Sequence, residues 1–451
     1  MGIPNQELLA HKPLNRSAAI YERALRVLPG GCSRNAILRQ PHPLYASHAS
    51  GCMITDIDGV ERIDFANNMT AMIHGHADPR IGEAVSKQVE KGTAFNIGTE
   101  VEIDFAEHMV SRSSSFEKIR FVNSGTEAVM ACLKAARAFT GRPKIAKAEG
   151  AYHGLYDYAE ISQTAQPSNW GEIDRPNPVP VCHGTPPKAL EDVVVIPFND
   201  VERSIAILNE QAEDLACVLI DLMPHRAGLI PATGEYVTAL RNWTSRNASL
   251  LVYDEVITYR SSYGGAQEWY HVDPDLTAMG KMIGGGFPIG AIAGRANVMD
   301  VMDPFAKKVL FPHSGTFSAN PVSMVAGLTA MQVFDADAVE ALNALGEYTR
   351  DTLRAVISDV DVPASVTGRG SMFKIHLKPQ PPASYREAYA QPSETKLLSE
   401  FLNLLFDDGI ILINSGAGTL STPMTRDVVD RLVLTVRSAL LSMRSQLEEQ
   451  T

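Results

Sequence analysis

Lys281 stands in an apolar, glycine-rich stretch, Thr277–Gly286, with no acidic residue within several positions. A lysine amine removed from water has a lowered pKa and becomes nucleophilic, which is the condition for Schiff-base chemistry. A lysine on an exposed glycine-rich turn is the alternative. The glycines are not a dinucleotide-binding motif, because their spacing is wrong and Pro288 stands where the phosphate-binding helix would begin.

Asp254 lies near the end of an apolar run, Leu250–Val256, that reads as a buried strand. A carboxylate in such a place needs a positive partner, because an unpaired buried charge costs several kcal/mol. The protonated ring nitrogen of a heterocyclic cofactor is one possible partner. A helix cap or an ordinary salt bridge is the alternative.

Two turns rich in small hydroxyl residues are candidate phosphate sites. In the first, a strand leads into Ser124-Gly125-Thr126 and then into a helical pattern. Glycine permits close approach, threonine offers a hydroxyl, and unpaired N–H groups at a helix start favour an anion. The second turn, His313–Pro321, precedes a helix with proline in its first turn. Simple helix capping is the alternative at both turns.

A nucleophilic lysine, a strand-end aspartate and two phosphate-binding turns together indicate a phosphorylated aldehyde held as an imine, namely pyridoxal 5'-phosphate (PLP). On these residues the chain resembles the class III aminotransferases, in the large PLP-dependent family that includes aspartate aminotransferase. The resemblance runs from about Tyr21 to Ser442. It is strongest toward glutamate-1-semialdehyde aminomutases and β-amino-acid transaminases, through Leu28–Gly31, Gly75–Pro79 and Asp273–Leu276.

The resemblance implies a role for each matching residue. Lys281 corresponds to the lysine that carries the cofactor and then moves the substrate's proton. Asp254 corresponds to the acid that keeps the pyridine nitrogen protonated. The other implied cofactor contacts are the phosphate-binding Ser124, Gly125 and Thr126, the ring-stacking Tyr152, Val256 on the opposite ring face, and Thr316, given to the phosphate by the neighbouring subunit.

Substrate recognition depends on other positions. Arg34 resembles the arginine with which β-amino-acid transaminases bind a substrate carboxylate, and a guanidinium suits that role through two hydrogen bonds. A surface arginine beside a turn is the alternative. Ser415 stands where an arginine would bind a second carboxylate, and Asp221–Leu222 replaces the family's usual Glu-Pro. We hypothesise that Arg226 compensates for the missing arginine.

The elements that must position these residues alternate between strand and helix from about Arg80 to Asp300. This alternation predicts a mostly parallel sheet with helices on both faces and ligands at the strand ends. With the resemblance, the expected fold is α/β: an aspartate-aminotransferase-like large domain (PLP fold type I) and a smaller α+β domain from both termini. The predicted boundaries are 1–69 and 320–451 for the two parts of the small domain and 70–319 for the large domain.

Residues Ser162–Leu190 interrupt the alternation, because their prolines cannot continue either a helix or a strand ladder. A loop of this length in a compact domain is usually a lid or a partner-contact segment. The prolines concerned are Pro167, Pro176, Pro178, Pro180, Pro186 and Pro187.

The composition excludes several classes of protein. The 451 residues are 45% hydrophobic and 20% charged, which excludes intrinsic disorder. With 40 Lys and Arg against 52 Asp and Glu and no basic stripe, no nucleic-acid partner is expected. Apolar runs far below about 20 residues and the start Met1–Gln6 indicate no membrane and a cytoplasmic location. The five cysteines are expected to be reduced, and His74, His76 and His153 structural, with no metal.

The expected activity is that of a homodimeric PLP-dependent aminotransferase, with a β- or ω-amino compound as donor and a 2-oxo acid as acceptor. The alternative is a glutamate-1-semialdehyde-type 2,1-aminomutase, which moves an amino group within one molecule. A non-catalytic protein on the same scaffold is disfavoured, because Lys281 and Asp254 are both present.

Overall fold

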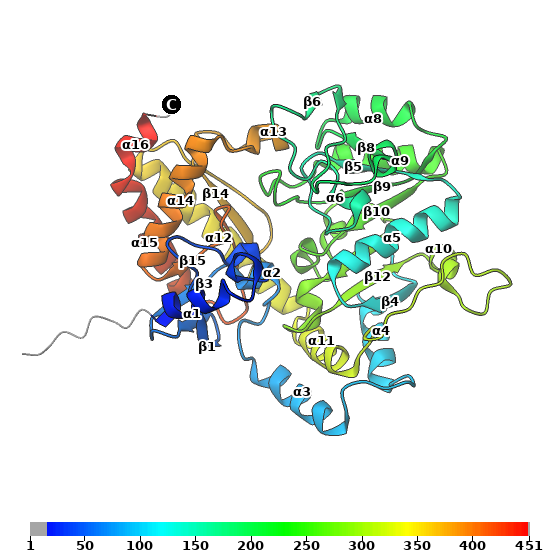
Figure 1. Cartoon of the computed structure of the whole chain (residues 1–451), viewed down its shortest axis with the longest axis horizontal. Helices are drawn as coiled ribbons and strands as arrows, with labels where there is room; N and C mark the ends of the chain where they lie inside the picture. The colour runs from blue at the N-terminus through cyan, green and yellow to red at the C-terminus, as the bar shows by residue number, and fades with distance from the viewer. Residues whose placement is uncertain (1–15, 450–451) are drawn as a thin grey trace, which may run out of the picture.

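The computed structural model describes residues 16–449; Met1–Asn15 of the predicted N-terminal part and residues 450–451 lie outside the described range. Figure 1 shows two lobes side by side. One lobe contains the middle of the chain, and the other contains segments from both ends. The fold therefore agrees with the prediction of a large α/β domain and a small domain from both termini.

The large domain is built on a seven-stranded sheet. Only β12 runs antiparallel to its neighbours, so the sheet is mostly parallel as predicted. In spatial order the strands are β4 (Lys118–Val122), β12 (Gly290–Gly294), β11 (Leu276–Gly280), β10 (Leu250–Asp254), β9 (Leu215–Asp221), β5 (Lys144–Ala148) and β8 (Val193–Ile196).

Each face of this sheet has its own apolar core. Along β9, Cys217 and Leu219 pack against α5 (Gly125–Thr140), whereas Val218 and Ile220 pack against α9 (Gly234–Arg246) on the other face. All four side chains are fully buried. This two-residue alternation, with apolar side chains on both faces, is typical of a strand covered by helices on both sides.

The small domain joins the two ends of the chain. Its four-stranded sheet has the order β1-β2-β3-β15, and its three-stranded sheet the order β13-β14-β16. Ile410 pairs in parallel with Ile63, which holds the late strand against the early one. The strands are β1 (Ala46–Ser50), β2 (Met53–Asp56), β3 (Glu61–Asp64), β13 (Ser365–Thr367), β14 (Met372–His376), β15 (Ile410–Ile411) and β16 (Ala417–Thr419).

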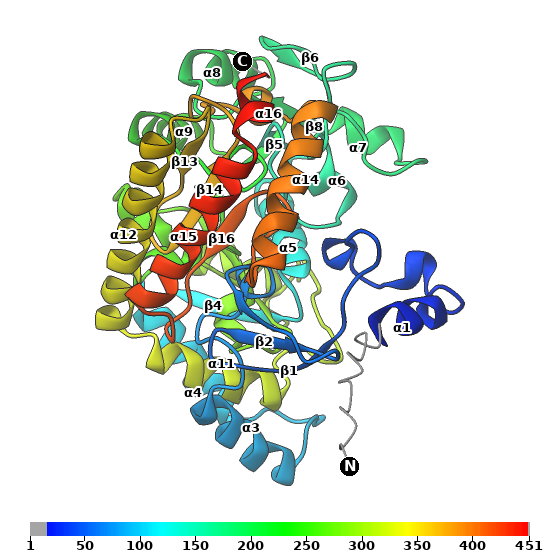
Figure 2. The ribbon, with the colours of Figure 1, turned by 90° about the vertical axis from the view of Figure 1, so that its left-hand side faces the viewer.

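Three long helices cover these sheets on the outside of the small domain (Figure 2). They are α12 (Ala336–Val360), α14 (Pro392–Asp407) and α15 (Arg426–Ser442). Helical periodicity in the sequence predicts the first over Ala338–Ser358 and the last over Thr425–Gln446. The C-terminal helix in fact ends at Ser442, and a separate short helix, α16 (Arg444–Glu448), follows it.

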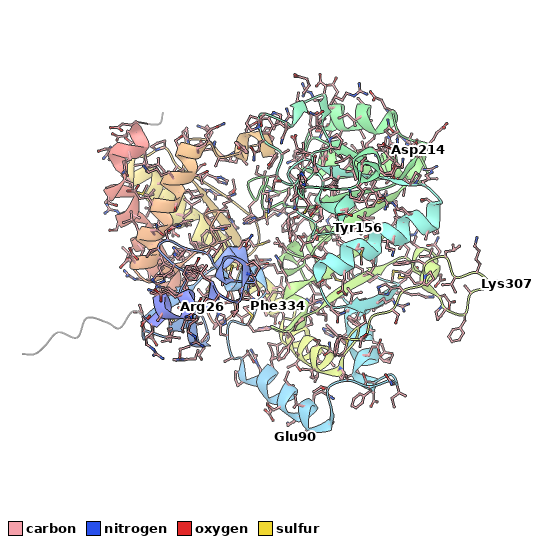
Figure 3. All side chains as sticks on the ribbon, in the orientation of Figure 1. Arg26, Glu90, Tyr156, Asp214, Lys307 and Phe334 are labelled. Atoms are coloured by element: carbon pink, nitrogen blue, oxygen red, sulfur yellow. The ribbon has the colours of Figure 1, made fainter. Side chains whose placement is uncertain are left out.

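The two domains meet at the end of α11 (Pro321–Val333), where Phe334 lies between them in Figure 3. Phe334 is fully buried and packs edge-on against His74, at 6.0 Å between ring centroids. Within residues 16–449 no single helix is long and apolar enough to cross a membrane. The pair α11 and α12 passes that test together on length and composition, with a bend of 72°.

Residues Ser162–Leu190 hold little regular structure. They contain a two-stranded hairpin of β6 (Gly171–Glu172) and β7 (Arg175–Pro176), and the start of a short helix, α7 (Pro187–Glu191). Buried Ser162 fixes the base of the segment, because its hydroxyl donates to Asn177 O and accepts from Val179 N. All five cysteines are free, as expected.

Candidate active site

Three neighbouring strands of the large sheet bring their carboxyl ends together. Asp221 ends β9 and lies in register with Asp254, which ends β10. Lys281 follows directly after β11, the next strand of the sheet. Parallel strands of this kind place ligand-binding residues at one edge. The sheet therefore brings the predicted lysine and aspartate together, and adds a second carboxylate.

Lys281 is partly buried and has an unusual backbone conformation. Its φ is 49°, in the left-handed region that non-glycine residues seldom adopt. Burial lowers the pKa of Lys281 to about 8, against the opposing effect of the Asp254 and Asp221 carboxylates. The positive charges of Arg260 and Arg34 add to the lowering. A large fraction of this amine is therefore neutral and nucleophilic near pH 8.

Asp254 is held by a buried histidine. His153 donates from Nδ1 to Asp254 Oδ2 at 2.7 Å, and the N–H of Val256 donates to Asp254 Oδ1 at 3.0 Å. Burial lowers the pKa of His153, although the hydrogen bond and the charge of Asp254 oppose the shift. Both oxygens of Asp254 thus accept a hydrogen bond, which fixes the orientation of the side chain. The sequence predicted His153 to be structural and did not show this contact.

The first hydroxyl turn forms the start of α5. Ser124 is its N-cap and accepts a hydrogen bond from Glu127 N at 3.2 Å, so the capping alternative is correct for this side chain. Gly125 lies against Val256: a Cβ on Gly125 would come within 2.8 Å of that side chain. The backbone N–H groups of Gly125 and Thr126, in the first helical turn, have no partners within the helix, which leaves them available to an anion.

Thr126 and Gly154 form a second close contact in the same place. A Cβ on Gly154 would lie 2.6 Å from Thr126 Oγ1, and Gly154 has a φ of +93° that favours glycine. Both glycines thus keep the turn free of side chains. This arrangement fits a phosphate held by Ser124, Gly125 and Thr126, with Val256 beside it.

Tyr152 and Arg226 lie next to each other at the opening of the site. The Tyr152 side chain is exposed, and the Arg226 guanidinium lies 5.3 Å from the centre of its ring. Arg226 also donates to Gln163 O at 3.2 Å, at the base of the proline-rich segment. An exposed aromatic ring in this position is free to stack on a planar ligand.

Arg34 is positioned by an unusual turn of the backbone. Its Nη1 donates to Asn68 Oδ1 at 2.6 Å. Asn68 belongs to a left-handed turn, Asn67–Thr70, in which four successive non-glycine residues have φ between 46° and 77°. Asn67 is fully buried and donates to Thr419 O at 2.8 Å, which fixes the turn to the small domain. Strained backbone of this kind is concentrated at functional sites.

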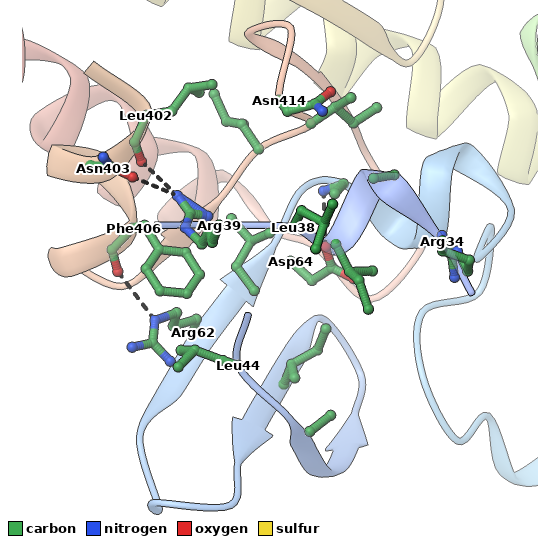
Figure 4. Close-up of a pocket in the computed structure, with 18 of the residues that line it drawn as sticks. Arg34, Leu38, Arg39, Leu44, Arg62, Asp64, Leu402, Asn403, Phe406 and Asn414 are labelled. Atoms are coloured by element: carbon green, nitrogen blue, oxygen red, sulfur yellow. Dashed lines mark hydrogen bonds between the residues drawn. The ribbon is translucent and has the colours of Figure 1, made fainter. Parts of the chain in front are cut away.

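A cavity of about 850 Å³ extends from Arg34 and Asn68 into the small domain (Figure 4). At its far side the guanidinium groups of Arg39 and Arg62 lie 3.5 and 4.1 Å from the ring centre of Phe406. Neither Lys281 nor Asp254 lines this cavity. It therefore adjoins the arginine of the site and is separate from the reactive lysine.

Two predicted residues lie apart from the cluster in the single chain. Thr316 is exposed, and among the described residues no hydrogen bond joins it to Lys281 or to the Ser124–Thr126 turn. Its assigned role, on a neighbouring subunit's phosphate, stays a prediction. Ser415 shares a hydrogen bond of 2.9 Å with the ring of His225. No group of His, Cys, Asp and Glu that could hold a metal ion occurs within residues 16–449.

Comparison with known proteins identifies the family. Residues 36–430 match the family model for class III aminotransferases. The chain belongs to this family. It is 37% identical over 398 residues to a glutamate-1-semialdehyde 2,1-aminomutase of Methanothermobacter thermautotrophicus. The matched residues cover 88% of this chain and 91% of the relative.

Solved structures of transaminases are similar over nearly the whole length. An omega-transaminase from Sphaerobacter thermophilus shares 46% identity with a TM-score of 0.93, over 95% of this chain and 98% of the other. A β-phenylalanine aminotransferase from Variovorax paradoxus shares 31% identity with a TM-score of 0.85, over 95% of this chain and 94% of the other. The enzyme is PLP-dependent, as is its family, and a similar transaminase has been solved with PLP bound.

The residues of the site fit this cofactor. The side-chain-free turn at Ser124–Thr126 suits the phosphate, and Asp254 suits a protonated pyridine nitrogen. When bound, PLP withdraws electrons from the carbon that carries the amino group. With the cofactor bound, neutral Lys281 Nζ would be the group that accepts the substrate's proton and returns it. His153 keeps Asp254 oriented, and the Arg34 guanidinium, held by Asn68, would be the group to pair with a substrate carboxylate.

Proposed function

We propose that this class III aminotransferase transfers an amino group from a β- or ω-amino compound to a 2-oxo acid. The observation that supports this most is the place of Arg34. Its charge is near enough to lower the pKa of Lys281, and Asn68 holds its guanidinium. A β-amino acid has its carboxylate one carbon further from the amine than an α-amino acid. A cation set apart from Lys281 suits that spacing.

The similarity to the omega-transaminase and to the β-phenylalanine aminotransferase supports the same donor class. The curated relatives, named glutamate-1-semialdehyde 2,1-aminomutases, favour the second candidate, an intramolecular aminomutase. The two candidates differ in one requirement. A transaminase needs an external amino acceptor for turnover, and an aminomutase does not.

The donor half-reaction tests the proposal. Purified enzyme loaded with PLP is mixed with β-phenylalanine in the absence of any acceptor, and the absorption spectrum is recorded. We expect the band near the visible edge to be replaced by that of the pyridoxamine form. Glutamate-1-semialdehyde is tested in parallel. If β-phenylalanine leaves the band unchanged while the semialdehyde is isomerised without an acceptor, the aminomutase is the correct assignment.

Variants of the two arginines test substrate recognition. We expect Arg34→Ala to raise the KM for β-phenylalanine by about tenfold or more, since a charged hydrogen bond contributes about 1.5–3 kcal/mol. An amine that lacks a carboxylate, 1-phenylethylamine, is the control and should be unaffected. Arg226→Ala should raise the KM for acidic substrates. Unchanged KM values for acidic substrates would remove Arg226 from the substrate site.

We further propose that the enzyme acts as a cytoplasmic homodimer. Large apolar side chains are exposed on the segment before α11, where Phe305 is 94% exposed and Phe317 59% exposed. This segment also carries Thr316, the residue assigned to the neighbouring subunit's phosphate. Burial of these side chains against a second copy would bring that threonine to a second active site.

A further inference from the structure

Lys374 is a buried lysine without a carboxylate partner among residues 16–449. It lies in the middle of β14, where Phe373 and Ile375 point into the core of the small domain. Lys374 faces the other way, as alternation along a strand requires. Its side chain is only 8% exposed, and none of the ion pairs within residues 16–449 includes it. By contrast, Lys378, which lies just after the end of β14, forms an ion pair with Glu394 at 2.7 Å.

The face of β14 that carries Lys374 packs against the segment that follows β9 in the large domain. Met372 lies in one apolar cluster with Met223 and Leu229. His376 Nε2 lies 3.1 Å from Gly228 O. The lysine therefore lies between the two domains, on the side toward the catalytic strand ends. The hydrogen bond that its Nζ donates within the described part of the chain is long, at 3.4 Å to the backbone oxygen of His225.

The pKa of His225 shows which charged side chains lie near Lys374. Its pKa is lowered well below the usual value by burial and by the positive charges of Lys374, Lys281 and Arg226, in that order. The ring of His225 also shares a hydrogen bond of 2.9 Å with the hydroxyl of Ser415. Two cations, Lys374 and Arg226, and a neutral imidazole thus lie near the reactive lysine. Such a place attracts an anion.

We propose that Lys374 binds the carboxylate of the 2-oxo acid acceptor. The inference rests on the proposed transaminase function and adds the group that recognises its second substrate. A buried ammonium without a counter-ion is costly, and a substrate carboxylate removes that cost by forming an ion pair. Burial lowers the pKa of Lys374 to about 8, so most of the amine still carries its charge at neutral pH. Arg34 remains free for the carboxylate of the amino donor.

The acceptor half-reaction tests Lys374 separately from the proposed donor. Enzyme is loaded directly with pyridoxamine 5'-phosphate and mixed with pyruvate, and the return of the PLP absorption gives a saturation constant. For Lys374→Met we expect this constant to rise about tenfold or more, as for the loss of a charged hydrogen bond. L-lactate, which cannot accept an amino group, is titrated into the PLP-loaded enzyme as an unreactive carboxylate. Its dissociation constant should rise in parallel.

Three further variants make the result specific. Lys396→Met removes one positive charge from the exposed face of the same domain and should change neither constant. Lys374→Arg should recover most of the affinity, and Lys374→Gln tests the loss of charge alone if Lys374→Met does not fold. Unchanged pyruvate and lactate constants in Lys374→Met would overturn the proposal. So would equal losses in Lys374→Met and Lys396→Met.

The donor half-reaction separates this proposal from the one on which it rests. Lys374→Met should react with β-phenylalanine at the wild-type saturation constant, because that carboxylate is assigned to Arg34. An equal loss for β-phenylalanine and pyruvate would contradict an acceptor-specific role. If wild-type enzyme fails with β-phenylalanine but the pyruvate result holds, the donor assignment is wrong and the role of Lys374 stands.

Discussion

The reactivity of Lys281 depends on its protonation, and its environment sets the pH at which that changes. Because burial lowers the pKa to about 8, the amine is protonated below that pH and neutral above it. We expect the rate of PLP attachment to the apoenzyme to rise about tenfold per pH unit below 8 and to level off above it. Stopped-flow absorbance measures this rate. A rise that continues to pH 10 would show an unperturbed lysine.

His153 has a positioning role through its hydrogen bond to Asp254. We expect His153→Leu to lower kcat by about 10–100-fold, because hydrogen bonds to charged groups contribute about 1.5–3 kcal/mol. Cofactor content, measured by absorbance, should stay near that of the wild type. The exposed His183 provides the matched control, His183→Leu. A kcat equal to that of the wild type would show that His153 does not position Asp254 for catalysis.

At the scale of secondary-structure elements, the approach of α5 to the strand end after β10 shapes the phosphate site. Gly125→Ala would place a methyl group 2.8 Å from Val256, which must then shift. We expect weaker PLP binding, and recovery in the double variant Gly125→Ala, Val256→Ala. Gly82→Ala in α3 (Pro79–Lys91) has nothing within 4 Å and is the control. Equal PLP affinity in Gly125→Ala and wild type, by equilibrium dialysis, would contradict the phosphate assignment.

Elements with strong local signals could be predicted from the sequence. The alternation of β9 and the buried face of α5 depend on residue periodicity alone. The helices α3 and α4 (Glu100–Ser111) were not predicted, since α3 buries only Ile81 and α4 only Phe105 and Met109. The antiparallel β12, Gly290–Gly294, is made of glycine, alanine and one isoleucine, so its composition carries no strand signal.

The residues of the site also divide into those that local sequence predicted and those that it did not. Asp254 and the Ser124–Thr126 turn follow strands that are visible in the sequence. The strand before Lys281, β11, was not predicted, but the structure brings the lysine to the aspartate as expected. The contacts of Asn68, His225 and Lys374 could not be predicted, because they form between segments that are far apart along the chain. Two successive asparagines, which tolerate left-handed backbone, were the only local signal of the turn at Asn67–Thr70.

At the scale of the whole molecule, the exposed apolar side chains before α11 point to a second subunit. We expect Phe317→Glu to shift the enzyme from dimer to monomer and to weaken PLP binding, because Thr316 would no longer reach a neighbouring site. Size-exclusion chromatography with light scattering gives the mass. Leu434→Glu, at a site 61% exposed on α15, is the control. A Phe317→Glu dimer as stable as wild type would place the interface elsewhere.

The central claim is that the amino group passes between two molecules. It is tested most directly with β-phenylalanine carrying a ¹⁵N amino group, pyruvate as acceptor and the PLP-loaded enzyme, with products followed by mass spectrometry. The account predicts ¹⁵N-alanine in a one-to-one ratio to the donor consumed. Label that never appears in alanine, while glutamate-1-semialdehyde is isomerised with its nitrogen retained, would contradict it and establish the aminomutase.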